Sequence, residues 1–390
     1  MNFGDCSYSY HAGKGQAAWD WLSGALTELH ADRFLVVSDR SLPRGVILEV
    51  TRHIARVAPA VALPFAGGET RKNLSTLQSL IASATDAGVS RRTCVVAVGG
   101  GVAGNVGGML AALMFRGVRF VQIPTTLLAM SDSVLSLKQA VSSRLGKNDV
   151  GTFHAPEFVW ANIDFLSSLP VKDRQAAMCE LIKNVVAIHP EDHDEVAGLL
   201  DSAGEYSAQQ YVHSIRLAIE HKSSVMANDQ YEKGVAMVLE YGHTVGHAVE
   251  LAMAGAVPHG IAIGIGMVVA ARVASHLNVA DVDVGGVIAE LLSRLDAPTW
   301  IPADIDAGEL MARVRRDNKR GYLAPRPGTC DMVLLRDLGA PITTGSRPLT
   351  PVPEEIIQRA ILECQDSPGT PPSWLPLLAR PELTAVGRDG

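Results

Sequence analysis

Short β-branched apolar runs alternate with amphipathic stretches through the first part of this 390-residue chain. Three such runs, at residues 34–37, 93–98 and 119–123, end in Ser-Asp, in three glycines and in Pro-Thr-Thr, respectively. Amphipathic stretches at residues 73–87 and 106–115 lie between them. Strands that alternate with helices predict a parallel α/β sheet that binds ligands at the carboxyl ends of its strands. We therefore expect a Rossmann-like N-terminal domain.

The pattern changes after about residue 165, where strand signals become rare. Long helices are predicted at residues 173–188, 207–226, 231–253 and 259–277, with a weak strand at 330–335. The chain is too long for one simple core. We expect an NAD-binding α/β domain at residues 1–165, a mainly α-helical metal and substrate domain at 166–366, and a proline-rich, poorly ordered tail at 367–390.

Composition excludes several classes of function. A net charge of -7 argues against a broad surface for nucleic acid, so the important cations should gather around a small anionic substrate. The five cysteines form no CxxC pair, which argues against a disulfide framework and suits a reducing cytoplasm. The amino terminus lacks the pattern of a signal peptide. Pro258, His259 and several glycines interrupt the apolar stretch 257–274, which we read as a buried helix and not a membrane span.

A glycine-rich turn follows the second predicted strand, in the segment 95–105. Glycines there allow the backbone to approach a pyrophosphate, whose charge is favoured by the amino terminus of the next helix. Plain packing explains such a turn equally well. Asp39, at the end of the first strand, is placed to bind a ribose, although acidic residues also occur in ordinary turns. The segment 67–72 is a second, weaker glycine turn.

Three histidines suggest a metal site. His243 and His247 are four residues apart and share one helix face, and His259 follows sixteen residues after His243. Upstream, Glu180 and Lys183 also share a face. A carboxylate with imidazoles suits zinc or cobalt and leaves a position open for substrate oxygens. Each histidine alone is better explained by helix packing, but three together favour a metal. No glutamate lies between the first two, which argues against a zincin protease.

Taken together, the motifs identify the chain as a member of the dehydroquinate synthase superfamily of sugar-phosphate cyclases. The resemblance runs from about Asp39 to Leu335. The motifs occur in the order GGGVAGNVGG, MFRG, PTTLLAMSDS, GKN, CELIKN, YGHTVGHAVE and PHG. So long an ordered set is highly specific. The resemblance assigns functions to lysines and arginines that, each taken alone, would be interpreted as ordinary surface residues.

The resemblance implies a role for each matching residue. The metal ligands would be Glu180, His243 and His259. The substrate phosphate would be held by Lys138, Asn148, His247 and Lys319, with Arg116 reaching in from the partner subunit of a homodimer. Sugar hydroxyls would meet Asp132, Lys147, Lys183 and Lys222. NAD would be bound by Asp39, Glu69, Lys72, Gly100, Gly101, Val102, Asn105, Thr125 and Thr126. The residues taken as catalytic are Lys138, Lys183, Lys222, Glu240 and His247.

Departures from the family pattern narrow the substrate. Dehydroquinate synthases usually bind the substrate carboxylate with an arginine and an asparagine, and this chain has Ala236 and Glu240 there. A carboxylate would be repelled by Glu240, whereas a sugar hydroxyl would find an acceptor. Asn105 replaces a customary aspartate, and Ser133–Gln139 lacks the usual glycine pair. These features resemble the 2-deoxy-scyllo-inosose synthases of aminoglycoside antibiotic pathways.

That resemblance implies a reaction on glucose 6-phosphate in one pocket. NAD would oxidise the C4 hydroxyl, phosphate would be eliminated, the hydride would return, and the opened ring would close as a carbocycle by aldol addition. The alternatives are a dehydroquinate synthase with an altered pocket, another cyclase acting on heptulose 7-phosphates, a metal-dependent polyol dehydrogenase, and an inactive NAD-binding protein. A dehydrogenase would not need Lys138, Asn148 and Lys319 as a phosphate cluster.

Overall fold

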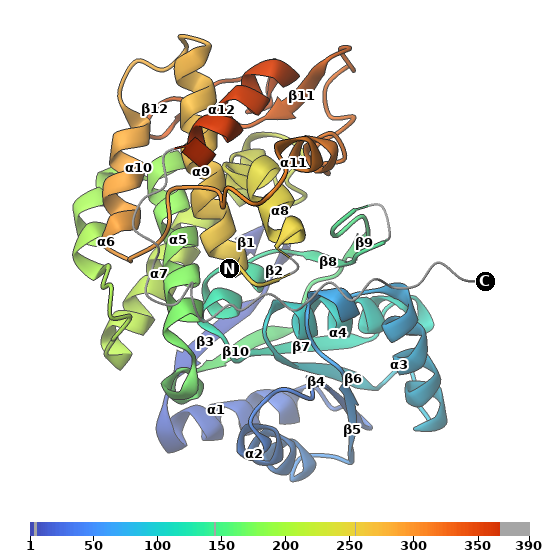
Figure 1. Ribbon diagram of the computed structural model, residues 1–390. Coiled ribbons are helices and arrows are strands. Elements are labelled where there is room, and N and C mark those ends of the chain that lie inside the picture. Colours follow the sequence, from blue (N-terminus) through green and yellow to red (C-terminus); the bar gives the residue numbers. More distant parts are fainter. Residues whose placement is uncertain (4–5, 144–145, 254, 367–390) are drawn as a thin grey trace.

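The N-terminal part is built on one parallel sheet. The structure, a computed structural model, describes residues 1–3, 6–143, 146–253 and 255–366 (Figure 1). Six parallel strands lie in the order β3-β10-β7-β6-β4-β5. Their bounds are β3 Ser9–Gly13, β4 Phe34–Asp39, β5 Ala60–Phe65, β6 Cys94–Gly99, β7 Arg119–Pro124 and β10 Phe158–Asn162. The predicted Rossmann-like domain is confirmed.

Helices cover both faces of this sheet. α1 (Gly15–Glu28) and α2 (Arg44–Ala55) pack on one face. α3 (Leu74–Asp86) and α4 (Gly101–Leu113) pack on the other. The chain runs outward from β4 to β5 and then crosses back to β6, so the strand order reverses between β4 and β6. Ligands of such sheets bind in the crevice at this reversal.

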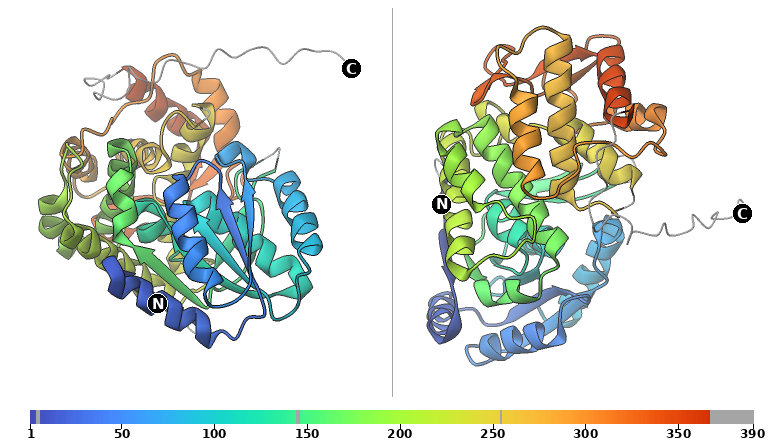
Figure 2. Two further views of the ribbon diagram at one scale, coloured as in Figure 1. Left: turned by 90° about the horizontal axis from the view of Figure 1, so that it is seen from below. Right: turned by 60° about the vertical axis from the view of Figure 1, so that its left-hand side comes forward.

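The second part is mainly helical, as predicted (Figure 2). Its helices are α5 Val171–Ala187, α6 His193–Leu199, α7 Ala208–Met226, α8 His243–Ala252, α9 His259–His276, α10 Val284–Ser293, α11 Ala307–Val314 and α12 Glu354–Asp366. α9 is the central helix and packs against α5, α8, α10 and α12. α9 is long and apolar enough to cross a membrane, but 78% of it is buried inside this part of the protein. It is therefore a core helix here.

Short elements connect these layers. The antiparallel pairs are β1 (Asn2–Phe3) with β2 (Cys6–Ser7), β8 (Lys138–Val141) with β9 (Val150–Phe153), β11 (Thr329–Met332) with β14 (Thr350–Pro353), and β12 (Leu335–Asp337) with β13 (Ala340–Pro341). Short helical segments of one or two turns include η1 Glu69–Arg71, η2 Met114–Arg116, η3 Ala129–Ser133, η4 Ile163–Ser168, η5 Pro190–Asp192 and η6 Val235–Glu240. The domain boundary expected at residue 165 falls within η4.

Two sequence expectations were wrong in detail. The single helix predicted at residues 231–253 is broken into η6 and α8, because Gly242 has a left-handed φ of 78° at the start of α8. A Cβ on Gly266 of α9 would lie 2.0 Å from the Gly242 carbonyl oxygen, so this turn presses directly on α9. α4 also begins at Gly101, five residues before its predicted start. The tail predicted at 367–390 lies outside the described residues.

Candidate active site

The proposed metal ligands meet where α5, α8 and α9 pack together. Nε2 of His259 lies 3.4 Å from Oε1 of Glu180, and Nε2 of His243 lies 3.9 Å from the same oxygen. Gly260 makes this possible, since a Cβ there would lie 1.8 Å from the carbonyl oxygen of Ala176, one turn before Glu180 in α5. The close approach of α9 to α5 brings His259 to the buried carboxylate.

Hydrogen bonds orient both imidazoles toward Glu180. Nδ1 of His243 lies 3.1 Å from the Tyr241 carbonyl oxygen, and Nδ1 of His259 lies 2.8 Å from Oε2 of Glu250. Each Nδ1 therefore serves as donor, which leaves Nε2 as the ligand atom, as is usual for metal-binding histidines. Neither oxygen of Glu180 has a well-directed hydrogen bond from the described residues. A buried carboxylate in this state fits a metal ion.

His247 is a fourth potential ligand in the same place. One nitrogen each of His243, His247 and His259 lie within 4.8 Å of one another. Nδ1 of His247 lies 3.7 Å from Oδ2 of Asp317, and burial lowers the pKa of His247. Because His247 faces Asp317, the set of Glu180, His243 and His259 is the better match to a carboxylate-histidine site.

Two buried lysines, Lys183 and Lys222, each pair with a carboxylate of the candidate site. Nζ of Lys183 lies 2.5 Å from Oε2 of Glu180. Burial alone would raise the pKa of Glu180, but the ammonium of Lys183 outweighs it and holds this pKa well below its usual range. Nζ of Lys222, on α7, lies 3.1 Å from both Oδ1 and the carbonyl oxygen of Asp132 in η3. The structure thus brings Lys222 against Asp132 and Lys183 against Glu180.

The cations of the phosphate cluster are already paired with carboxylates. Nζ of Lys138 lies 2.6 Å from Oε2 of Glu232 and 4.0 Å from Oε1 of Glu240. Nζ of Lys319 lies 3.2 Å from Oε2 of Glu240 and 2.8 Å from Oδ1 of Asp317. Glu232 and Asp317 are the partners in these ion pairs that the sequence analysis did not identify.

The crevice between β4 and β6 holds the candidate nucleotide residues. Gly99 ends β6 with φ 150°, and Gly100 caps the amino terminus of α4. The carboxylate of Asp39 lies directly over Gly67, where a Cβ would come within 1.6 Å of Oδ2. The hydroxyl of Thr125 is buried and has no hydrogen-bond partner among the described residues. An acidic side chain, a free amide-lined turn and an unpaired hydroxyl at one crevice suit a dinucleotide.

A second group links this crevice to the substrate side. Nζ of Lys72 donates to Oδ1 of Asn148 at 2.5 Å, and burial lowers the pKa of Lys72 to about 8. Nζ of Lys147 lies 2.5 Å from Oε1 of Glu250 and 3.7 Å from Oε1 of Glu69. The turn between β8 and β9 therefore contacts both the nucleotide side and the metal side.

Two predicted site residues have other surroundings. The carboxamide of Asn105 donates to the Gly101 carbonyl oxygen and accepts from the Ala140 amide, each at 2.9 Å, so it fastens α4 to β8. Arg116 lies exposed in η2 with φ 69°, and its guanidinium makes no hydrogen bond or ion pair with the described residues.

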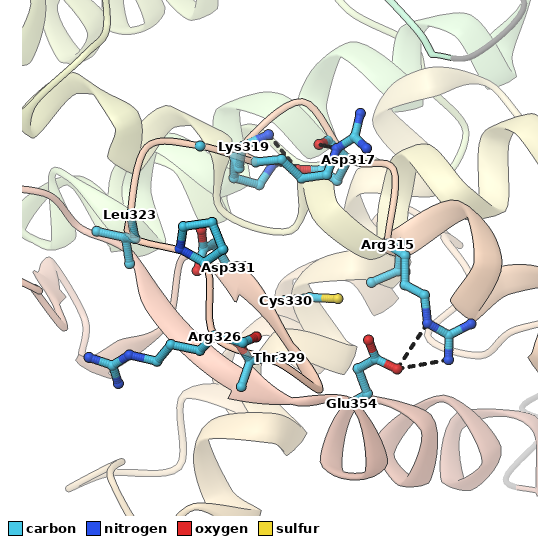
Figure 3. Close-up of a pocket in the computed structure, with 13 residues that line it drawn as sticks. Arg315, Asp317, Lys319, Leu323, Arg326, Thr329, Cys330, Asp331 and Glu354 are labelled. Atoms are coloured by element: carbon cyan, nitrogen blue, oxygen red, sulfur yellow. Dashed lines mark hydrogen bonds and ion pairs between the residues drawn. The ribbon is translucent and has the colours of Figure 1, made fainter.

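A pocket of about 350 Å³ opens beside this cluster (Figure 3). Asp317 and Lys319 form one wall, and the Arg315–Glu354 ion pair lies at the other, with Nη2 2.8 Å from Oε2. Arg326 also lines it. The pocket therefore approaches the phosphate cluster from the side of α11 and α12.

A second set of potential metal ligands lies between η5 and α7. His189, Asp192 and His221 each offer an atom within 4.8 Å of the others. His221 Nε2 already lies 2.8 Å from Asp192 Oδ2, and His189 Nε2 lies 2.9 Å from Ser224 Oγ. The two rings stack with centroids 4.6 Å apart. Parallel imidazoles direct their lone pairs poorly toward one ion, so these residues tie η5 to α7.

Comparison with known proteins places this arrangement in a family. The 3-dehydroquinate synthase N-terminal family matches residues 62–176, and the C-terminal family matches residues 177–320. A 2-deoxy-scyllo-inosose synthase from Streptoalloteichus tenebrarius is 42% identical over 369 residues, which cover 94% of this chain and 95% of that protein. One from Micromonospora echinospora is 44% identical over 338 residues, covering 87% and 85%.

A solved structure agrees with these relatives. The crystal structure of a 2-deoxy-scyllo-inosose synthase complexed with carbaglucose-6-phosphate, NAD⁺ and Co²⁺ superposes with a TM-score of 0.87 at 37% identity. The match covers 93% of this chain and 99% of that chain. The similarity covers almost the full length of both chains. It therefore includes both parts of the fold and the junction between them, where the candidate residues lie.

Proposed function

The chain belongs to the dehydroquinate synthase family, and we propose that it is a 2-deoxy-scyllo-inosose synthase that converts glucose 6-phosphate to a carbocycle and phosphate. Glu240 is the observation that carries the choice of substrate. Its carboxylate lies between Lys319 and Lys138, and Ala236, four residues earlier in η6, is fully buried. The pocket thus offers a hydroxyl an anionic acceptor and offers a carboxylate no guanidinium at position 236.

Glu180, His243 and His259 would hold one Zn²⁺ or Co²⁺ ion, and the crevice between β4 and β6 would hold NAD. The bound ion supplies stabilisation of negative charge that develops on sugar oxygens. NAD supplies a reversible acceptor for hydride. Both groups are consistent with what the related crystal structure contains.

The chain's own residues position the sugar and neutralise its phosphate. Lys138 and Lys319 bind phosphate oxygens, because both ammonium groups lie beside Glu240, and the amide of Asn148 adds a further donor. Glu240 accepts a hydrogen bond from a sugar hydroxyl and thereby orients the ring. Lys183 and Lys222 donate to hydroxyls deeper in the cavity. His247 is neutral at physiological pH, since burial lowers its pKa, and it can accept and return a proton beside the phosphate.

The proposal is tested by phosphate release from purified enzyme supplied with NAD and cobalt. Glucose 6-phosphate and the carboxylated heptulosonate phosphate of dehydroquinate synthases are offered in parallel, with a heptulose 7-phosphate that has no carboxylate as a third substrate. Release from glucose 6-phosphate alone, together with a cyclic ketone and no accumulation of NADH, supports the proposal. Release only from another substrate, or steady formation of NADH, would refute it.

We also infer that the enzyme acts as a homodimer in which Arg116 completes the partner's phosphate site. An exposed guanidinium that has no hydrogen-bond or ion-pair partner among residues 1–3, 6–143, 146–253 and 255–366 of its own chain supports this. R116A and E240Q subunits, each strongly impaired alone, should regain activity when refolded together, because mixed dimers contain one intact site. No recovery would contradict a shared site.

We further propose a cytoplasmic location, since the described cysteines Cys94, Cys179, Cys330 and Cys364 are all free thiols.

A further inference from the structure

Glu250 is a buried carboxylate at the end of α8 that contacts two parts of the site at once. Its Oε2 lies 2.8 Å from Nδ1 of His259, and its Oε1 lies 2.5 Å from Nζ of Lys147. Only about 9% of its side chain is exposed. Glu250 itself belongs to none of the sets of residues assigned above to metal, phosphate, sugar or NAD.

The contact with His259 fixes the ligand atom of that histidine. An imidazole that donates from Nδ1 to a carboxylate keeps Nε2 unprotonated and directed away from the carboxylate. In this structure Nε2 of His259 is the atom that lies 3.4 Å from Glu180. A carboxylate partner also raises the electron density on the imidazole, which strengthens its bond to a metal.

The contact with Lys147 joins two parts of the fold. Lys147 lies in the turn between β8 and β9, next to Asn148, whereas Glu250 and His259 belong to the helical part. Lys147 also lies 3.7 Å from Glu69 in η1, beside the nucleotide crevice. One carboxylate thus connects a metal ligand with the turn that carries two substrate-binding residues.

We propose that Glu250 is a positioning residue that orients His259 for the metal through one oxygen and holds Lys147 in the substrate pocket through the other. The inference rests on the proposed function for its metal and substrate. It adds Glu250, a residue that contacts neither the metal nor the substrate. It also links the position of the turn between β8 and β9 to the geometry of the metal site.

The test measures Co²⁺ binding to chelator-stripped protein in the absence of substrate, by visible absorption and by competition with a chelator. E250Q keeps the side-chain volume but leaves one of the two contacts without an acceptor. We expect about 10- to 100-fold weaker Co²⁺ binding, the usual loss when a carboxylate partner of a ligand histidine is removed. E250D keeps both oxygens and should restore part of the affinity. If E250Q does not fold, E250D is compared directly with the wild type and should bind about tenfold more weakly.

Matched variants separate positioning from general damage. E363Q removes a carboxylate 2.9 Å from His276, which lies at the far end of the same helix α9, and should bind Co²⁺ like the wild type. K147M leaves the hydrogen bond between Glu250 and His259 intact. This variant should therefore bind Co²⁺ nearly normally but show a raised KM for glucose 6-phosphate. Unchanged Co²⁺ affinity in E250Q, or in E250D where E250Q does not fold, overturns the inference. Failure of the proposed function would appear separately, as absence of the cyclic product from wild-type enzyme.

Discussion

The ammonium of Lys319 lies 3.2 Å from the carboxylate of Glu240 in a site that both residues share with the proposed substrate. Lys319 is also 2.8 Å from Asp317, so two carboxylates neutralise one buried cation before any phosphate arrives. Burial alone would raise the pKa of Glu240, but Lys319, His243 and Lys138 keep it well below its usual range. Glu240 is therefore an anion throughout the physiological range. A hydroxyl donor is the natural partner for its remaining lone pairs.

Replacement of this anion should impair the reaction of glucose 6-phosphate. E240Q preserves shape but weakens the acceptor that orients the sugar. We expect kcat/KM for glucose 6-phosphate to fall about 100-fold or more, which is typical for loss of a positioned polar or acid-base group. Initial rates of phosphate release provide the measurement.

The control is E290Q, which removes a carboxylate paired with Arg294 on the surface of α10. This variant should keep wild-type kinetics. Wild-type rates in E240Q would mean that Glu240 does not contact the substrate and serves only as an ion-pair partner of Lys319.

Local patterns predicted the framework of this protein well. The β-branched runs before Asp39 and Gly99 are strands of the sheet, and the stretch from His259 is the buried helix α9. These predictions depend on periodicity and turn residues within a few positions. The break at Gly242 was missed because an apolar pattern continues across it, and only the contact of Gly242 with α9 requires the left-handed turn.

Long-range pairs could not be read from the sequence. Glu232 contacts Lys138 across 94 positions and Lys319 contacts Glu240 across 79 positions. Neither spacing carries a signal in one chain. The histidine spacing suggested a metal, but Glu180 entered the ligand set only through the family resemblance. The structure supplies what spacing could not, namely that α5 and α9 touch at Gly260.

Gly67 should be essential to the position of Asp39 at the nucleotide crevice. Its φ is not in the left-handed region, so alanine strains no backbone there, but its methyl group would lie 1.6 Å from Oδ2 of Asp39. The carboxylate would have to leave its place and its bond from the Ser41 amide. We expect G67A to bind NAD about tenfold more weakly, the loss of roughly one charge-assisted hydrogen bond. Calorimetric titration with NAD measures this.

A second glycine provides the comparison for this variant. A Cβ at Gly45, in α2, would meet nothing within 4 Å, so G45A should bind NAD like the wild type. Equal NAD affinity in G67A and G45A would remove Asp39 from the nucleotide site.

The affinity for NAD should fall as the pH rises from 7 to 9. Burial lowers the pKa of Lys72 from 10.5 to about 8, so its ammonium loses its proton within this range. The loss of positive charge weakens attraction to the pyrophosphate. In K72M the affinity should be low at pH 7 and nearly independent of pH. Replacement of the exposed Lys14 by methionine should leave the wild-type profile, and a wild-type profile in K72M would assign the titration to another group.

Asp317 should stabilise the fold through its bond to Lys319. Burial alone would raise its pKa, but Lys319 and His247 lower it from 3.8 to about 2. A carboxyl group whose pKa is lower in the folded than in the unfolded protein contributes its full stability above pH 3.8 and loses it as the pH falls through about 2. D317N leaves Lys319 with Glu240 as its remaining anionic neighbour, at 3.2 Å.

Loss of one partner from such a buried pair should cost a few kcal/mol at neutral pH, less than the roughly 3–5 kcal/mol seen when a buried charge is left alone. D317N should therefore melt at a lower temperature than the wild type in calorimetry. The difference should persist down to about pH 4 and shrink toward pH 2 as Asp317 is protonated in the wild type. A difference that stays constant to pH 2 would mean that D317N acts through packing, because the other carboxyl groups titrate in both proteins and only the wild type has the charge of Asp317 to lose.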